Sequence, residues 1–101
     1  MPAIEERFWD YVGTHLKDRI IPGCKYSITE DSITIIHVLD NGKSVSIEYL
    51  IGQNDTQLIT IEIYKHVENG WMPIAMKYIS EGNGFMFEQF YNEMMKVAKG
   101  E

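Results

Sequence analysis

Hydrophobic and polar residues alternate through the middle of the chain, between residues 44 and 80. A period of two residues is typical of β-strands with one buried face. The segments 44–51 and 57–67 both show this alternation, and a hairpin closed through residues 52–56 brings their apolar positions opposite one another. The predicted pairs are Tyr49 with Ile59, Ile47 with Ile61 and Val45 with Ile63. Because every apolar residue then meets another, we expect this register.

A third strand follows the pair Asn69-Gly70 and ends near Ser80. Asn-Gly favours a two-residue hairpin turn, since both of its residues accept a positive φ. A turn of this length pairs Ile63 with Met76, Ile61 with Tyr78 and Glu62 with Lys77. Pro73 has no amide hydrogen to donate, so we expect this strand at an edge of the sheet.

Two further strands, 25–29 and 32–39, precede the hairpin. The second joins the segment 44–51 through Asn41-Gly42, another two-residue turn signal. The resulting pairs are Val38 with Val45, Ile36 with Ile47 and Thr34 with Tyr49, all on the inner face. We therefore expect Ile33, Ile35, His37 and Leu39 on the outer face, beside Ser44, Ser46, Glu48 and Leu50. Two registers are compatible with the sequence of the first strand. Tyr26 and Ile28 point inward if the following turn has three residues, and outward if it has two.

A helix is predicted at each end of the chain. Apolar residues recur at every fourth position from Ile4 to Ile20, and Pro22-Gly23 ends this pattern. A second helical pattern begins near Phe85 and carries Phe87, Phe90, Tyr91, Met94, Val97 and Ala98. The predicted fold is one α+β domain, residues 1–101, with an N-terminal helix, a five-stranded antiparallel meander and a C-terminal helix. Either both helices cover the inner face, as a two-layer sandwich, or one covers the outer face.

The chain has 101 residues and a formal net charge of −6. This charge disfavours direct binding to nucleic acid or to an anionic membrane, because both need clustered Lys and Arg. No segment has the length of a transmembrane helix, and the first residues lack the pattern of a signal peptide. Cys24 has no second cysteine to pair with. We expect a cytoplasmic protein.

Residues that could carry chemistry are few. His37 and His66 with Glu48 and Glu62 do not converge as a zinc site needs. Ser46, His37 and Glu62 share a cross-strand row without an oxyanion hole. The remaining candidates are Cys24, which lacks a helix amino terminus to activate it, and Gly82-Asn83-Gly84, which lacks the lysine of a phosphate loop. We therefore expect no enzyme activity, no catalytic residue, no metal and no cofactor.

Acidic residues gather at one end of the predicted meander. The turns at Glu30-Asp31, at Asp55 and at Glu81 all fall there, and Glu5 and Glu6 join them if the first helix runs antiparallel to its neighbours. The opposite end collects Lys17, Arg19, Lys43, Lys96 and Lys99. Beside the acidic end, the outer face would carry apolar residues that charge surrounds, which is typical of protein-binding patches. The predicted binding residues are Glu30, Asp31, Ile33, Ile35, Leu50, Asp55 and Leu58.

These features favour a small acidic module, without enzyme activity, that binds a protein with a basic surface. In size, charge and order of elements the chain resembles some phage-encoded inhibitors of bacterial defence nucleases. The resemblance implies an inhibitor from a phage or another mobile element, and a target that handles nucleic acid. Two alternatives stay open: a homodimer formed through the outer faces, and an apolar-ligand protein. The second would use a cavity lined by Tyr49, Met76, Tyr78, Phe87 and Phe90.

Overall fold

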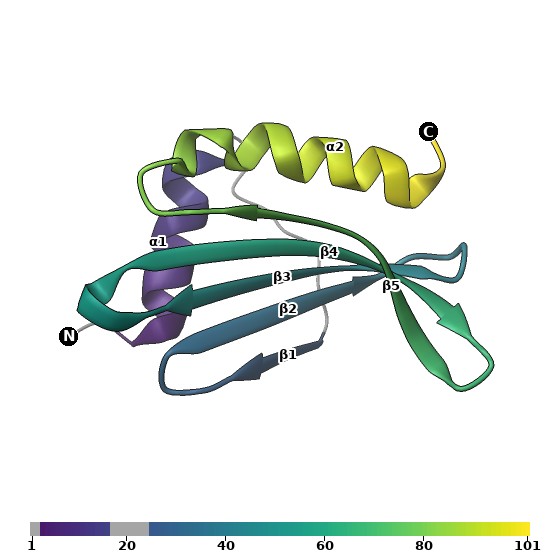
Figure 1. The fold of residues 1–101 in the computed structure, drawn as a ribbon, viewed down its shortest axis with the longest axis horizontal. Coiled ribbons are helices and arrows are strands. Elements are labelled where there is room, and N and C mark those ends of the chain that lie inside the picture. The colour runs from purple at the N-terminus through teal and green to yellow at the C-terminus, as the bar shows by residue number, and fades with distance from the viewer. Residues whose placement is uncertain (1–2, 17–24) are drawn as a thin grey trace.

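The computed structural model describes residues 3–16 and 25–101 (Figure 1). The elements are α1 (Ile4–His15), β1 (Lys25–Ile28), β2 (Ser32–Val38), β3 (Lys43–Ile51), the 3-10 turn η1 (Gln53–Asp55), β4 (Gln57–Val67), β5 (Gly70–Ile79), the 3-10 turn η2 (Gly84–Met86) and α2 (Phe87–Lys99). The strands form one antiparallel sheet in the order β1-β2-β3-β4-β5. This confirms the predicted α+β fold, and it confirms that β5 lies at an edge.

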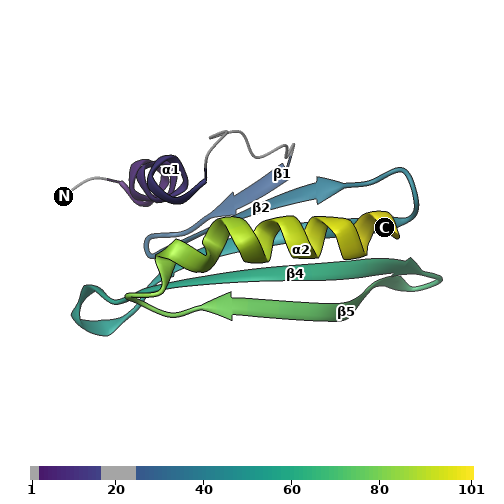
Figure 2. The same ribbon diagram turned by 90° about the horizontal axis from the view of Figure 1, so that it is seen from above.

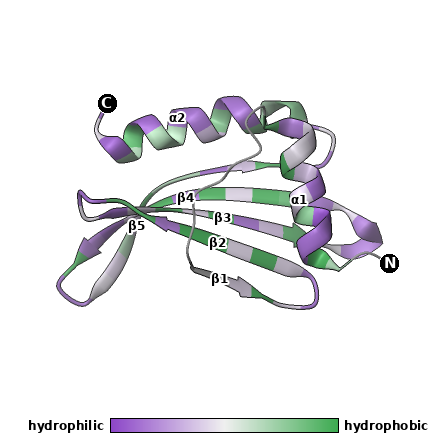
Figure 3. Ribbon diagram, turned by 180° about the vertical axis from the view of Figure 1, so that it is seen from behind, coloured by the Kyte–Doolittle hydropathy of each residue, from purple (hydrophilic) through white to green (hydrophobic). Residues whose placement is uncertain are grey.

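Both helices lie on the same side of the sheet (Figure 2). One cluster of buried side chains joins the two layers, with residues from α1, from α2 and from the inward positions of the strands. It contains Ile4, Phe8, Val12, Leu16, Ile33, Ile35, Val45, Ile47, Tyr49, Ile59, Ile61, Ile63, Ile79, Phe87, Tyr91, Met94 and Ala98. Hydrophobic bands accordingly recur along β2, β3 and β4 (Figure 3). Neither α1 nor α2 covers the other face of the sheet.

The helices differ slightly from their predicted bounds. Helix α1 ends at His15, and Leu16 already has an extended backbone, so the predicted continuation to Ile20 is wrong at this point. Several predictions concern residues 17–24, which lie outside the described residues. They are the helix stop at Pro22-Gly23, the role of Cys24, and the basic residues Lys17 and Arg19. Helix α2 starts after a single 3-10 turn and ends at Lys99, and its C-cap Gly100 has a φ of 81°, which favours glycine.

The pairing of β3 with β4 follows the predicted register. Tyr49 lies opposite Ile59, Ile47 opposite Ile61 and Val45 opposite Ile63, and all six residues are buried. Residues 53–55 form a 3-10 turn inside the connection, with Asn54 and Asp55 both at positive φ. The apolar alternation of these two long strands was therefore enough to place them.

The pairing of β2 with β3 is shifted by one residue from the prediction. The loop contains the three residues Asp40, Asn41 and Gly42, and the Leu39 amide donates to the Lys43 carbonyl oxygen at 2.8 Å. One extra loop residue moves every side chain of a paired strand to the other face. Ile33 and Ile35 are therefore inner residues, 1% and 5% exposed, and their predicted place on the outer face is wrong.

The pairing of β4 with β5 is also shifted. The turn consists of Glu68 and Asn69, so Val67 lies opposite Gly70, and an extra residue in β5 then forms a bulge beside Pro73. A proline fits such a position because it has no amide hydrogen for the ladder. Beyond the bulge Ile61 pairs with Lys77 and Glu62 with Met76. The predicted partners, Tyr78 for Ile61 and Met76 for Ile63, are wrong.

The turn before β2 takes two residues, since the Thr29 amide donates to the Ser32 carbonyl oxygen at 2.9 Å. Ile28 lies opposite Ile33 and shares its side of the sheet. The sequence predicted that a two-residue turn would point Ile28 outward. This is wrong, because the prediction assumed that its partner Ile33 was an outer residue.

Candidate functional site

The candidate site is the sheet surface that neither helix covers, which we call the open face. It consists of the outward positions of β2, β3, β4 and β5, where side chains alternate with those of the core. Its large apolar residues are Ile36, Val38, Leu50, Leu58, Tyr64, Trp71, Met76 and Tyr78. Met76 and Tyr78 are 57% and 63% exposed. Clustered apolar side chains on an uncovered sheet face are typical of an interaction surface.

Two carboxylates lie among these apolar residues. Glu62 is opposite Ser46 and Met76, and Glu48 is opposite Thr34 and Thr60. The Tyr64 hydroxyl donates to Glu62 Oε2 at 2.9 Å. The pKa of Tyr64 is raised above its ordinary value. Partial burial is the largest cause, and the hydrogen bond to Glu62 and the negative charges of Glu62 and Glu48 raise it further. Both carboxylates therefore influence the same phenol.

No cation neutralises these acids within the described part of the chain. The ion pairs there are Arg7 with Asp55 and Lys77 with Glu93, and neither pair includes Glu48 or Glu62. Lys77 lies on the helix side, where its ammonium is 3.0 Å from Glu93 Oε2 and 4.5 Å from the centre of the Phe90 ring. The open face thus presents uncompensated negative charge inside an apolar surface.

A shallow hollow of about 260 Å³ lies at the end of the open face that is nearer to the β2–β3 and β4–β5 turns. Its lining residues are Thr34, Ile36, Ser44, Ser46, Tyr64 and Trp71. The β4–β5 hairpin curves here (Figure 1), as expected next to a bulge. Ser44 and Ser46 are only 3% and 8% exposed although neither α1 nor α2 lies over them. Their cross-strand neighbours flank them: Val38 and Tyr64 beside Ser44, and Ile36 and Glu62 beside Ser46.

The acidic end is present where the sequence predicted it. Glu30, Asp31 and Asp55 line one hollow of about 330 Å³ beside Arg7. The Arg7 guanidinium donates to Asp55 Oδ1 at 2.7 Å, and this bond lowers the pKa of Asp55. Asp55 is therefore partly compensated by a cation that the sequence pattern did not pair with it.

Leu50 and Leu58 lie opposite each other on the open face, close to this acidic end, as predicted. At the other end of the molecule the Asn41 amide donates to the Ala98 carbonyl oxygen at 2.7 Å. This bond joins the β2–β3 turn, next to Lys43, to the last turn of α2, which carries Lys96 and Lys99. These three lysines therefore lie near this end, together with Asp40 of the same turn and Glu68 of the β4–β5 turn, which offset part of their charge.

Other predicted groupings do not form. His37 is on the helix side, so it is separated from Ser46 and Glu62, and its Nδ1 is buried without a hydrogen-bond partner among the described residues. No set of three or more His, Cys, Asp or Glu in residues 3–16 and 25–101 is placed to hold a metal ion.

The aromatic cavity proposed for an apolar ligand does not form either. Tyr49 and Phe87 are core residues, whereas Met76 and Tyr78 are on the opposite side of the sheet. Sequence reasoning also missed Ile36, Tyr64, Met76 and Tyr78 as surface candidates. One signal was present in the sequence: Ile35 and Ile36 are adjacent, and adjacent strand residues must point to opposite faces.

Comparisons with known protein families, with curated protein sequences and with solved structures found no match for this chain. None of the helices in the described residues is long and apolar enough to cross a membrane.

Proposed function

We propose that this chain is a binding module, without catalytic activity, whose open face docks on another protein. One observation carries the proposal: large apolar side chains occupy outward positions on four adjacent strands while both helices cover the opposite face. An antiparallel sheet with one solvated face normally places polar residues there. An apolar surface of this kind gains free energy when a partner removes it from water.

The charge of the open face favours a partner that presents Lys or Arg. Glu48 and Glu62 would lose water on docking, and burying an unpaired carboxylate costs several kcal/mol. A guanidinium or ammonium group from the partner would remove this cost, and a guanidinium could also stack on Tyr64 or Tyr78. Proteins that handle nucleic acid are one class with basic surfaces. If this chain occupied the basic surface of such a protein, it would act as an inhibitor.

The same acids disfavour a symmetric dimer through the open face. In an isologous interface each patch meets its own copy, which brings acidic residues of one subunit toward those of the other. Like charges that face each other across an interface oppose association. The negative rim formed by Glu30 and Asp31 would further steer a basic partner toward this end of the molecule.

The proposal can be tested without a known partner, by selecting random displayed peptides on the immobilised protein. We expect enriched peptides to combine Lys or Arg with aliphatic or aromatic residues. Synthetic copies should bind wild type and the Glu6→Lys control equally, because Glu6 is an exposed residue of α1, on the other side of the sheet. Glu62→Lys should weaken their binding by roughly tenfold or more, the scale of one lost charge-assisted contact.

A matched pair of methionines tests the face itself. Met76 is on the open face, whereas Met72 is on the same strand, 47% exposed, and opposite Lys65 on the other side. Met76→Lys should abolish peptide binding and Met72→Lys should preserve it. Enriched peptides without basic residues, or equal losses from both variants, would overturn the proposal. Concentration-dependent dimerisation that Met76→Lys alone removes would favour the homodimer instead.

A further inference from the structure

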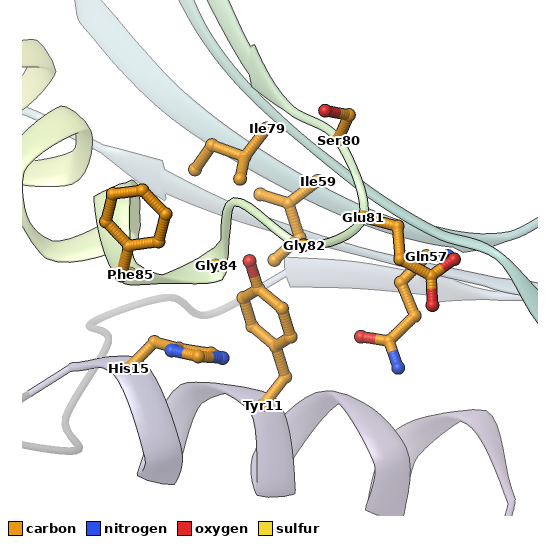
Figure 4. A pocket seen from close by; sticks show the side chains of 10 residues that line it. All are labelled: Tyr11, His15, Gln57, Ile59, Ile79, Ser80, Glu81, Gly82, Gly84 and Phe85. Atoms are coloured by element: carbon orange, nitrogen blue, oxygen red, sulfur yellow. The ribbon is translucent and has the colours of Figure 1, made fainter.

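A second hollow lies on the helix side, between α1 and the segment that connects β5 to α2. Its volume is about 310 Å³, near the lower end of the range for small-molecule sites. Tyr11 and His15 reach it from α1, Gln57 from the start of β4, and Glu81 and Phe85 from the connecting segment (Figure 4). We call this hollow the α1 cleft. It shares no lining residue with the open face.

Polar groups of the α1 cleft keep hydrogen-bonding capacity for a ligand. Figure 4 shows the Tyr11 hydroxyl directed into the hollow, with Gln57 and Glu81 together on one side of it. In the described part of the chain, the side chains of Tyr11, His15 and Gln57 make no hydrogen bond. Glu81 Oε2 accepts one bond, from the Gln57 backbone N–H at 3.2 Å, which leaves its second oxygen available.

The charge of the α1 cleft is negative. Glu81 is the only carboxylate among its described lining residues, and no Lys or Arg lines it. An adjoining hollow of about 360 Å³ shares Tyr11, His15 and Gln57 and adds Asp10. It also adds Arg7, but that guanidinium is bonded to Asp55. A ligand with a phosphate or carboxylate would therefore meet repulsion, and a cation would be attracted.

The remaining walls are apolar or aromatic. Ile59 and Ile79 form one side, and the rings of Tyr11 and Phe85 line the hollow (Figure 4). Burial raises the pKa of Tyr11 to about 12, so its hydroxyl is neutral at physiological pH and its oxygen can accept a hydrogen bond. Aromatic faces attract organic cations, which suits a site that pairs them with a carboxylate.

The wall between α1 and the connecting segment is closely packed. A Cβ added to Gly84 would lie only 2.6 Å from His15 Nε2. The absence of a side chain at this glycine lets the imidazole close against the backbone. Tyr11 is held in turn by ring contacts with His15 at 4.6 Å and with Phe87 at 5.6 Å. The Tyr11 hydroxyl is therefore positioned before a ligand arrives, which lowers the entropic cost of binding.

We propose that the α1 cleft binds a small organic amine. Its ammonium would donate to Glu81, to the Gln57 amide oxygen and to the Tyr11 hydroxyl oxygen, and its apolar body would lie against Ile59, Ile79 and Phe85. An ammonium has three donors and no acceptor, which matches these three oxygen acceptors.

Three probes of similar shape distinguish the charge of the ligand: phenethylamine, 2-phenylethanol and 3-phenylpropionate. Binding is followed by titrating each probe into isotope-labelled protein and recording backbone amide shifts. Phenethylamine should shift the amides of residues 57 and 81 and bind on the order of tenfold more tightly than the alcohol, because a charge-assisted bond to a carboxylate is lost without the amine. The acid should bind most weakly.

Glu81→Gln keeps an oxygen that can accept the Gln57 backbone N–H, so the fold is preserved while the charge is removed. This variant should lose on the order of tenfold in phenethylamine affinity. The control, Glu68→Gln in the β4–β5 turn, should bind as wild type does. No detectable binding of phenethylamine, equal binding of amine and alcohol, or unchanged affinity in Glu81→Gln would each overturn the proposal.

Discussion

Ile35 and Ile36 allow a direct test of which face of β2 is buried. They are adjacent and have the same side chain, yet Ile35 packs in the core opposite Ile47, whereas Ile36 is on the open face opposite Ser46. Replacing each with alanine removes the same three carbon atoms. Both residues are central in the same strand, so the two costs differ mainly in how each side chain packs on its own face of the sheet.

The structure predicts a large difference between the two variants. Ile35 is 5% exposed, so its alanine variant loses about 0.8 kcal/mol for each of three buried carbons, or about 2.4 kcal/mol. The cavity left behind adds to this, which places the total cost at about 2–5 kcal/mol. The partly exposed Ile36 should cost roughly 1 kcal/mol or less. For a domain of this size the gap corresponds to a difference of several degrees or more in Tm.

Urea unfolding of both variants, at two protein concentrations, measures the difference. Ile35→Ala should lower the unfolding midpoint strongly at both concentrations, and Ile36→Ala should lower it only slightly. If Ile36→Ala proves the more costly at both, β2 has the register that a two-residue Asn41-Gly42 turn would impose, and the open face is wrongly assigned. A cost for Ile36→Ala that grows with concentration would instead indicate self-association through this face.

Two further predictions concern α1. Gly84→Ala should destabilise the fold by roughly 1–3 kcal/mol, because the new Cβ would lie 2.6 Å from His15 Nε2, and adding His15→Ala should recover much of the loss in denaturant unfolding; strictly additive costs would contradict this contact. Arg7 lowers the pKa of Asp55, so near the ordinary value of 3.8 the unfolded chain binds more protons than the folded one. The stability that this carboxylate contributes is complete above that value and is lost as the pH falls through the lower pKa of the folded state. Tm measured across acidic pH should therefore fall less steeply in Arg7→Gln than in wild type. Identical slopes in the two proteins would contradict the pairing.

Much of the fold could be predicted because the two central strands are long and strictly alternating. Pairing β3 with β4 in any neighbouring register would place Ile47 or Ile61 opposite polar residues, so the hydrophobic effect selects one register. The two helices are similarly marked by regular apolar spacing, and α2 also by its terminal Gly100. Where the pattern is long, local and tertiary preferences agree.

The shifted strands show where sequence reasoning stops. Asn-Gly strongly favours a two-residue turn, but the loop of Asp40, Asn41 and Gly42 adopts three, with Gly42 at a φ of 82°. The difference between two and three loop residues is a small local free energy, and the packing of Ile33 and Ile35 against the helices outweighs it. In β5 the turn and the bulge each change the register, and no residue pattern distinguishes their combination from a regular hairpin.

The candidate site inherited these errors in part. The acidic turns were placed correctly because chain order alone brings alternate turns of a meander to one end. The apolar half of the predicted patch depended on register, so it contained Ile33 and Ile35 in place of Ile36. The α1 cleft was not predictable, because it depends on how α1 packs against residues 80–85 and no periodic pattern records that contact.

β2 supplies the strongest argument for the proposed partner of the open face. β2 carries Ile33 and Ile35 on the helix side and Ile36 and Val38 on the other, and such two-sided apolar strands are typical of sheets covered on both faces. The helices of the described residues cover one face only, which supports our proposal that a partner covers the second. In this proposal the apolar residues supply the docking surface and Glu48 and Glu62 set the charge of the partner, since an apolar partner without a cation would bury two unpaired carboxylates. Removing both acids, as Gln, should therefore broaden the selected peptides toward uncharged sequences rather than end binding.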